Sequence, residues 1–268
     1  MFSSLSYTAQ SDDADGLVWK REFGGMMKSV WRVSVVRAVA AVSFLILFAI
    51  AAVQAQEPGN ASVIRGVDAA VMARIDGIAG YTVTEHYAVY RNKDEEHPVA
   101  EMTVKTTYKK ETGKSYAIVT QSGSEIIRKL VLGAILDNEQ RINQPGTREG
   151  SWLTSANYEM NLKPGGTQRL DGRECLILDI SPKRKTPYLI QGTIWVDAKD
   201  YLIVQLQGTA SKSSSVFTGA TQMMREYTNV NGFAMATHAR ATSDSFLFGQ
   251  TIVKIDYQGY EIQLRPAK

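Results

Sequence analysis

The sequence predicts an α+β fold that is mainly β, with about nine or ten strands in one antiparallel sheet and two helices. Between residues 157 and 208, Leu176, Leu178 and Ile180 recur with the period of two that is typical of strands. Short turns such as Asp171-Gly172 separate these runs, as expected between adjacent antiparallel strands. Two other segments show the helical period of about 3.6 residues.

The first 55 residues are expected to lie outside the folded domain. Residues 1–25 are interpreted as a leader from a misassigned start codon, because a signal peptide normally begins close to its basic region, here near Met26. Residues 26–55 are interpreted as a signal peptide, in which basic residues precede an apolar run at 38–53 and small residues fit cleavage after Ala55. We therefore expect a periplasmic protein. An uncleaved anchor is the alternative, although 16 apolar residues fall short of the ~20 that span a bilayer.

Residues 56–268 are predicted to form a single domain, since 268 − 55 = 213 residues suffice for a substantial core. The first helix ends near residues 77–80, and its apolar stripe comprises Val63, Val67, Val71, Ile75 and Ile78. Strands are expected next, at residues 81–91, 100–108 and 115–121.

Ser124 is predicted to cap a second helix that runs to about Arg141. Its apolar face is expected to comprise Ile127, Leu130, Val131, Ala134 and Ile135. The chain beyond is nearly all strand to Ile262, with Asn231-Gly232 as a hairpin turn. Two helices cannot cover so long a sheet unless the sheet curls around them, and curling leaves a concavity. Either side chains fill that space, or it is apolar and accepts a lipid tail.

Several segments in this part of the chain resemble a known class in their order and spacing. They are Asn157-Tyr158-Glu159, Gly172-Arg173-Glu174-Cys175, Pro182-Lys183-Arg184, Tyr188-Leu189, and Gly192-Thr193-Ile194-Trp195-Val196-Asp197 followed by Tyr201. Over residues 60–262 the chain resembles secreted bacterial proteins of the outer-membrane lipoprotein-sorting class, similar to LolA, LolB and the amino-terminal domain of RseB/MucB. The resemblance implies a strongly curved antiparallel half-barrel, covered by helices around an apolar cavity that takes acyl chains.

The residues themselves offer no candidate for catalysis, for a metal or for a cofactor. His86, His97 and His238 are scattered, no serine stands in a Gly-x-Ser-x-Gly motif, and Asp197 with Asp200 brackets a hairpin turn. The single cysteine, Cys175, is expected to be a buried thiol. A formal net charge of +3 gives no reason to expect nucleic acid. We therefore expect a protein that is not an enzyme.

The predicted function is a periplasmic carrier for a lipid or lipoprotein acyl chain, in outer-membrane lipoprotein sorting or envelope lipid transport. Its cavity is predicted to lie on the more apolar phase of each strand, with two residues of the second helix as a lid. The cavity candidates are Val104, Leu178, Ile194, Val196, Leu202, Val204, Val253 and Ile255 on strands, and Val131 and Ile135 on the helix.

Two further clusters leave alternatives open. The basic run Lys183-Arg184-Lys185 between two prolines is either a solvated turn or a contact for an anionic membrane or envelope protein partner. Met and Phe residues late in the chain form either core or an adaptable apolar surface: Phe217, Met223, Met224, Phe233, Met235, Phe246 and Phe248. We expect a monomer. The alternative functions are a single-domain envelope sensor that resembles the RseB/MucB amino-terminal domain, and a secreted enzyme.

Overall fold

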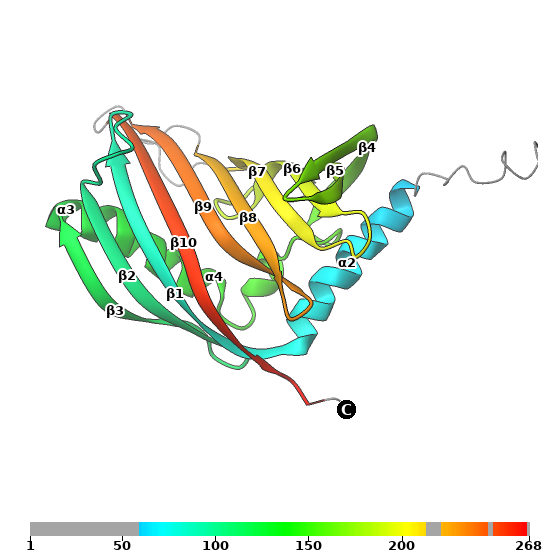
Figure 1. Cartoon of the computed structure of the whole chain (residues 1–268), viewed down its shortest axis with the longest axis horizontal. Coiled ribbons are helices and arrows are strands. Elements are labelled where there is room, and N and C mark those ends of the chain that lie inside the picture. Colours follow the sequence, from blue (N-terminus) through cyan, green and yellow to red (C-terminus); the bar gives the residue numbers. More distant parts are fainter. Residues whose placement is uncertain (1–58, 213–220, 246–248, 267–268) are drawn as a thin grey trace, which may run out of the picture. The chain divides into compact units, whose positions relative to one another are not determined.

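The computed structural model describes residues 59–212, 221–245 and 249–266, which form one curved, unclosed sheet with helices on its concave side (Figure 1). The predicted fold class, mainly β with a curved antiparallel half-barrel sheet and two helices, is confirmed. The expected leader, the signal peptide and the cleavage site at Ala55 lie outside the described residues, as do Phe217, Phe246 and Phe248.

All ten strands of the sheet are antiparallel to their neighbours. They are β1 (Ile78–Arg91), β2 (Ala100–Lys109), β3 (Gly113–Gly123), β4 (Tyr158–Leu170), β5 (Arg173–Pro182), β6 (Ile190–Asp197), β7 (Ile203–Ala210), β8 (Gln222–Val230), β9 (Phe233–Ser245) and β10 (Gly249–Leu264). Their order in the sheet is β3-β2-β1-β10-β9-β8-β7-β6-β5-β4. Strands adjacent in sequence are therefore adjacent in space, except that β3 and β4 form the two opposite edges of the sheet. In the middle of the sheet, β1 pairs with β10.

The turns between strands follow their backbone chemistry. Asp171 and Gly172 have φ of 48° and 75°, and Asn231 and Gly232 have φ of 54° and 86°, which are the left-handed values that two-residue hairpins require. In the turn after β6, Asp197 Oδ1 accepts a hydrogen bond from the Lys199 amide at 2.8 Å. The predicted hairpin turns are confirmed, and the carboxylate of Asp197 serves the backbone.

The first helix, α2 (Asn60–Gly77), buries Val63, Val67 and Val71, as its sequence period predicts. The second helical stretch is continuous and has three parts: α3 (Glu125–Ile127), a π-helical segment (Arg128–Gly133) and α4 (Ala134–Ile142). A short 3₁₀ turn follows at Arg148–Ser151. Ser124 Oγ accepts a hydrogen bond from the Ile127 amide at 3.4 Å, so the predicted cap is confirmed. Within the described residues, no helix combines the length and apolarity needed to cross a membrane.

The structure corrects the predicted apolar face of the second helix. Leu132 and Leu136, which are four residues apart and so share one face, face the sheet with exposed fractions of 0% and 8%. Leu130, which was predicted on the apolar face, is instead 64% exposed.

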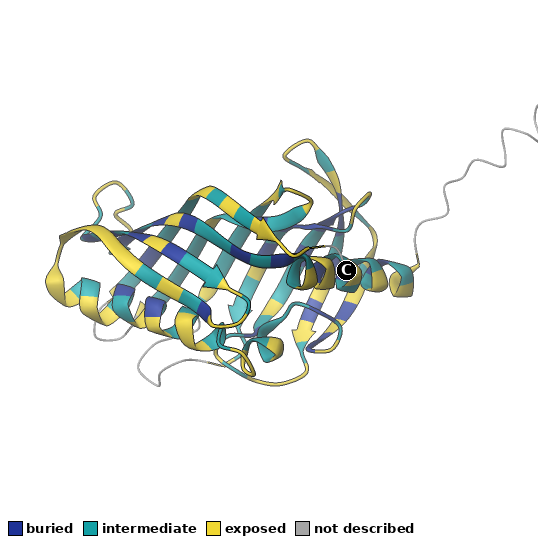
Figure 2. Cartoon of the chain, turned by 90° about the horizontal axis from the view of Figure 1, so that it is seen from below, coloured by how far each residue is buried: buried dark blue, intermediate teal, exposed yellow. Residues whose placement is uncertain are grey.

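Two separate hydrophobic cores lie on the concave face. The α2 core joins α2 to strands β4 to β7, and Leu178, Ile180 and Ile194 are among its most buried members. The α4 core joins the second helical stretch to strands β1, β2 and β10 through Leu132, Tyr87 and Val104. Figure 2 shows buried positions alternating with less buried ones along the strands. The helices therefore cover the two sides of the sheet, and the strands between them are left without a helix of their own.

Candidate functional site

A cavity of about 900 Å³ lies between the two cores. Both helices, the loops that connect them to the sheet, and strands β7 to β10 contribute to its lining. Its volume is at the upper end of the range for small-molecule sites, about 300–1,000 Å³. The concavity that the sequence predicts is thus not filled by side chains.

The floor of this cavity is largely β9, and five of the seven β9 residues in its lining have small side chains. The five are Ala234, Ala236, Ala239, Ala241 and Ser243, and the other two are Met235 and Arg240. A register shift in the pairing of β8 with β9, where Glu226 pairs with His238 and Tyr227 with Ala236, changes the phase of the strand between Ala236 and Ala239. The small side chains occupy little volume and so leave space for the cavity.

Larger apolar side chains form the walls on the two neighbouring strands. Met223 of β8 and Val253 of β10 both pair with Ala241, one on each side of it. Ile255 pairs with Ala239 in the same way. The helix contributes Val131 and Ile135 from above. An apolar trough therefore runs along β9 between methionine and aliphatic walls.

One end of the trough is closed by aromatic side chains. Tyr81 stacks on Tyr108 with ring centroids 5.1 Å apart, and Tyr260 meets Tyr81 edge-on at 5.8 Å. The Tyr260 hydroxyl donates to the Ala236 carbonyl at 2.9 Å, and Arg148 donates to the Tyr108 hydroxyl at 3.2 Å. These bonds satisfy the polar atoms at an otherwise apolar end.

The opposite side of the cavity carries exposed apolar side chains. Ile126 and Leu130 line the cavity although 67% and 64% of their surfaces are exposed. A side chain can border a cavity and remain exposed only where the cavity opens to solvent. We therefore identify the start of the second helical stretch as one border of the entrance.

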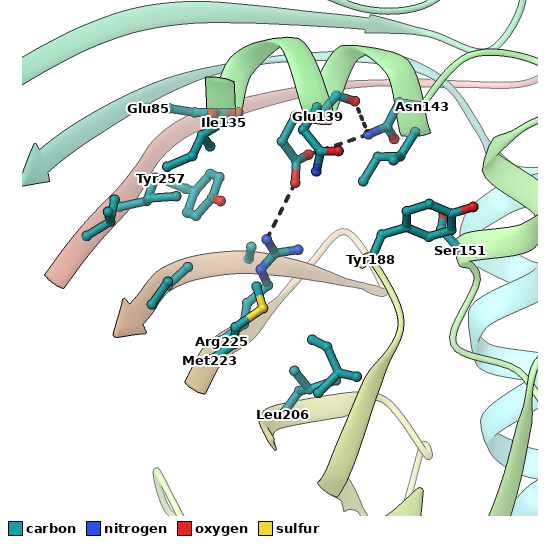
Figure 3. Close-up of a pocket in the computed structure, with 18 of the residues that line it drawn as sticks. Glu85, Ile135, Glu139, Asn143, Ser151, Tyr188, Leu206, Met223, Arg225 and Tyr257 are labelled. Carbon is teal, nitrogen blue, oxygen red and sulfur yellow. Dashed lines mark hydrogen bonds and ion pairs between the residues drawn. The ribbon is translucent and has the colours of Figure 1, made fainter. Parts of the chain in front are cut away.

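A charged cluster projects into the apolar space from the second helical stretch and from the sheet (Figure 3). Lys114 Nζ of β3 lies 2.8 Å from Glu139 Oε2 of α4, and Asn143 Nδ2 lies 3.4 Å from the same oxygen. Arg225 of β8 reaches across the cavity toward Glu139 and approaches its Oε1 at 3.8 Å. Burial alone would raise the pKa of Glu139, but Lys114 and Arg225 outweigh it and lower that pKa to about 2.

The structure places five of the ten predicted cavity residues in the lining: Val131, Ile135, Leu202, Val253 and Ile255. The other five are buried in or beside the cores. Val104 belongs to the α4 core, and Leu178, Ile194 and Val196 belong to the α2 core. Val204 is 2% exposed and lies where the pairing of β6 with β7 skips a residue.

The basic run Lys183-Arg184-Lys185 is exposed, as expected between two prolines, but its members differ. Lys183 lies 3.6 Å from Glu159. Arg184 donates to the Asn157 side-chain oxygen at 2.7 Å and to the Gly150 carbonyl at 3.1 Å. Since Asn157 is only 6% exposed, Arg184 anchors two loops to each other.

Sequence reasoning missed both the floor and the charged cluster. The signal for the floor was present as alternating small residues in Ala239-Arg240-Ala241-Thr242-Ser243. No local pattern links Lys114, Glu139 and Arg225, because they come from β3, α4 and β8.

Other chemistry is sparse in the described part of the chain. No group of three His, Cys, Asp or Glu residues there could hold a metal ion. The Cys175 thiol is buried, as predicted, and burial raises its pKa. A thiol of raised pKa carries little of the reactive thiolate.

The chain is similar to several solved structures at low sequence identity. A LolA superfamily protein from Nitrosomonas europaea is 10% identical, over 78% of this chain and 96% of its own, with a TM-score of 0.41. A DUF1329 family protein from Desulfovibrio piger is 16% identical, over 75% of this chain and 93% of its own, with a TM-score of 0.38. A domain described as that of an outer membrane lipoprotein-sorting protein, from Vibrio parahaemolyticus, is 12% identical, over 74% of this chain and 91% of its own, with a TM-score of 0.41. No protein-family model and no curated protein sequence matches the chain. The similarity is one of fold.

Proposed function

We propose that the protein is an exported, non-enzymatic carrier that holds a lipid or lipoprotein acyl chain in the cavity between α2 and α4. One observation carries this proposal. The 900 Å³ space has a floor of small side chains and walls of methionine and aliphatic side chains, and it opens beside Ile126 and Leu130.

An alkyl chain matches this space energetically. Each CH₂ group that moves from water into an apolar site contributes about 0.8 kcal/mol, so a long chain gains substantial affinity without any specific polar contact. Met223, Met224 and Met235 line the cavity, and their flexible side chains can repack around chains of different length. The resemblance of the sequence extends the proposal to lipoprotein chains, and hence to lipoprotein sorting or envelope lipid transport.

The test is the content of the cavity in protein purified from its own cells. Native mass spectrometry should show an added mass that organic extraction removes and that is recovered as an acylated lipid. The extracted protein should then increase the fluorescence of the neutral probe N-phenyl-1-naphthylamine, and a long-chain alcohol should displace that probe. A protein that carries no lipid and binds no probe would contradict the proposal.

Export is part of the proposal and has its own measurement. Amino-terminal sequencing of the protein from a periplasmic fraction should begin at Gln56. Retention of the apolar run at 38–53 in a membrane fraction would identify an anchor instead.

A further inference from the structure

The cavity contains more positive than negative charge. Seven lining residues are cationic and two are acidic: Arg74, Arg91, Lys114, Arg141, Arg148, Arg225 and Arg240, against Glu85 and Glu139. Two acidic residues outside the lining also form ion pairs there, Glu149 with Arg148 and Glu95 with Arg240. With these two included, the cations of the cavity still outnumber the acidic residues.

Arg225 is the cation best placed to meet a ligand. In the described chain, the one carboxylate within ion-pair distance of Arg225 is that of Glu139, and its 3.8 Å separation is too long for a hydrogen bond. Lys114 already neutralises Glu139 at 2.8 Å. The guanidinium therefore points into the cavity next to a carboxylate that another cation satisfies (Figure 3).

The second lining carboxylate belongs to the Lys114 side of the cluster. Glu85 is 2% exposed and accepts a hydrogen bond from the Tyr87 hydroxyl. Burial opposes the charged form of Lys114, but Glu139, and more weakly Tyr81 and Glu85, raise its pKa well above the usual range. Lys114 is therefore the close partner of Glu139, and Arg225 is the more distant one.

The surroundings of Arg225 include the hydroxyl groups of Tyr227 and Tyr257, and otherwise they are mostly apolar. Met223 lies two residues before Arg225 on the same face of β8. On the neighbouring strands, Ala239 of β9 pairs with Arg225, and Ile255 of β10 pairs with Ala239. Leu206 of β7 and Ile135 of the helix complete the ring (Figure 3). A negative group bound at the guanidinium would have its chain in the apolar trough along β9.

We propose that the cavity takes a single-chain amphiphile with a carboxylate or phosphate head, which Arg225 holds. This inference rests on the proposed lipid-binding function and specifies the ligand. Arginine donates two parallel hydrogen bonds to either kind of head, and such charge-assisted bonds are about twice as strong as neutral ones. A neutral head gains no such bond.

The test compares ligands that differ only in the head. Tetradecanoate, tetradecyl phosphate and tetradecan-1-ol, each below its aggregation concentration, compete with N-phenyl-1-naphthylamine on the extracted protein. We expect the two anions to displace the probe at concentrations about tenfold lower than the alcohol, which corresponds to about 1.4 kcal/mol. The relative potency of the two anions then separates a fatty acid from a phosphorylated lipid as the source of the head.

Variants at Arg225 test whether this residue causes the preference for anionic heads. R225Q should abolish the greater potency of the anions and leave displacement by the alcohol unchanged. R225K, which keeps a positive charge, should retain part of the greater potency of the anions. R169Q, at an exposed arginine of β4, is the matched control and should behave like the wild type. Thermal melts of each variant establish that it is folded.

The outcomes separate this inference from the proposed function. If no ligand displaces the probe, the lipid-binding function itself is wrong. If the alcohol and the anions displace it equally from the wild type, the cavity binds chains but does not select an acidic head. If folded R225Q keeps the preference, Arg225 is not the residue that holds the head.

Discussion

Strands β6 and β9 belong to the same sheet, yet the concave face of β6 is buried in a core and that of β9 lines a cavity. On β6, Ile194 and Val196 are completely buried in the α2 core. On β9, Ala239 and Ala241 border open space. The difference shows that this fold makes a core where large side chains pack against a helix, and a cavity where the side chains of the sheet are small.

The largest effect that separates the two regions should come from truncation in the α2 core. Leu178 is fully buried, so L178A should lower the free energy of unfolding by about 2–5 kcal/mol in urea denaturation. Affinity for N-phenyl-1-naphthylamine should stay the same under conditions where the variant is folded. A variant that keeps its stability but loses probe affinity would place Leu178 on the cavity and remove the distinction between core and cavity.

The next effect concerns the charged cluster and depends on pH. Since the pKa of Glu139 is lowered from 4.5 to about 2 in the folded protein, its charge stabilises the fold at every pH above about 4.5, and this contribution is lost as the pH falls toward 2. E139Q should therefore be less stable than the wild type by about 2–3 kcal/mol at pH 7.

Near pH 2 this difference should largely disappear, because the wild-type carboxyl is then neutral in the unfolded chain and about half neutral in the folded protein. Urea denaturation of both proteins across this pH range measures the effect. A difference that is the same at pH 7 and at pH 2 would mean that the glutamine disturbs packing, and that the charge of Glu139 contributes nothing.

A smaller effect on stability, with a large effect on binding, is expected on β9. A241L places a leucine in the trough, so probe affinity should fall about tenfold, whereas stability should change by less than about 1 kcal/mol because the space is already present. T242L is the matched control, since neighbouring residues of a strand point to opposite faces. Equal loss of affinity in both variants would show that the leucine perturbs β9 without filling the cavity.

The smallest effect is expected at the basic run. We propose that Lys183 and Lys185 contact anionic membranes or partners, and K183Q/K185Q should change stability by no more than about 0.5 kcal/mol per site. Binding to anionic liposomes should weaken at low salt and match the wild type at high salt, because salt screens exposed charges. Unchanged binding at low salt would identify a solvated turn. R184Q should cost more stability than the double variant, since Arg184 bonds to Asn157 and Gly150.

Most of the fold could be predicted from the sequence because its helices, strands and turns depend on patterns among neighbouring residues. The period of two on β5 and the glycines of the hairpins depend on neighbouring residues, and so does the cap at Ser124. Alternation also identified Leu178 and Ile194 as facing the concave side. It could not tell whether a helix covers them, because α2 comes from residues about a hundred positions earlier in the chain.

The remaining site features depend on exceptions to periodicity and on tertiary contacts. The register shift beside His238 changes the phase of β9 between Ala236 and Ala239, and a fixed period of 2 cannot represent such a change. The cluster of Lys114, Glu139 and Arg225 exists only once three elements have come together.

The pairing of β1 with β10 has a consequence for how the chain folds. Ile78 and Leu264 are partners although they stand near opposite ends of the described sequence, so the contact order of this pairing is high. Until the last strand has been synthesised, β1 and β9 both expose unpaired edges in the middle of the future sheet, where aggregation begins most easily. The folding chain is therefore most prone to aggregation until β10 has paired with both β1 and β9.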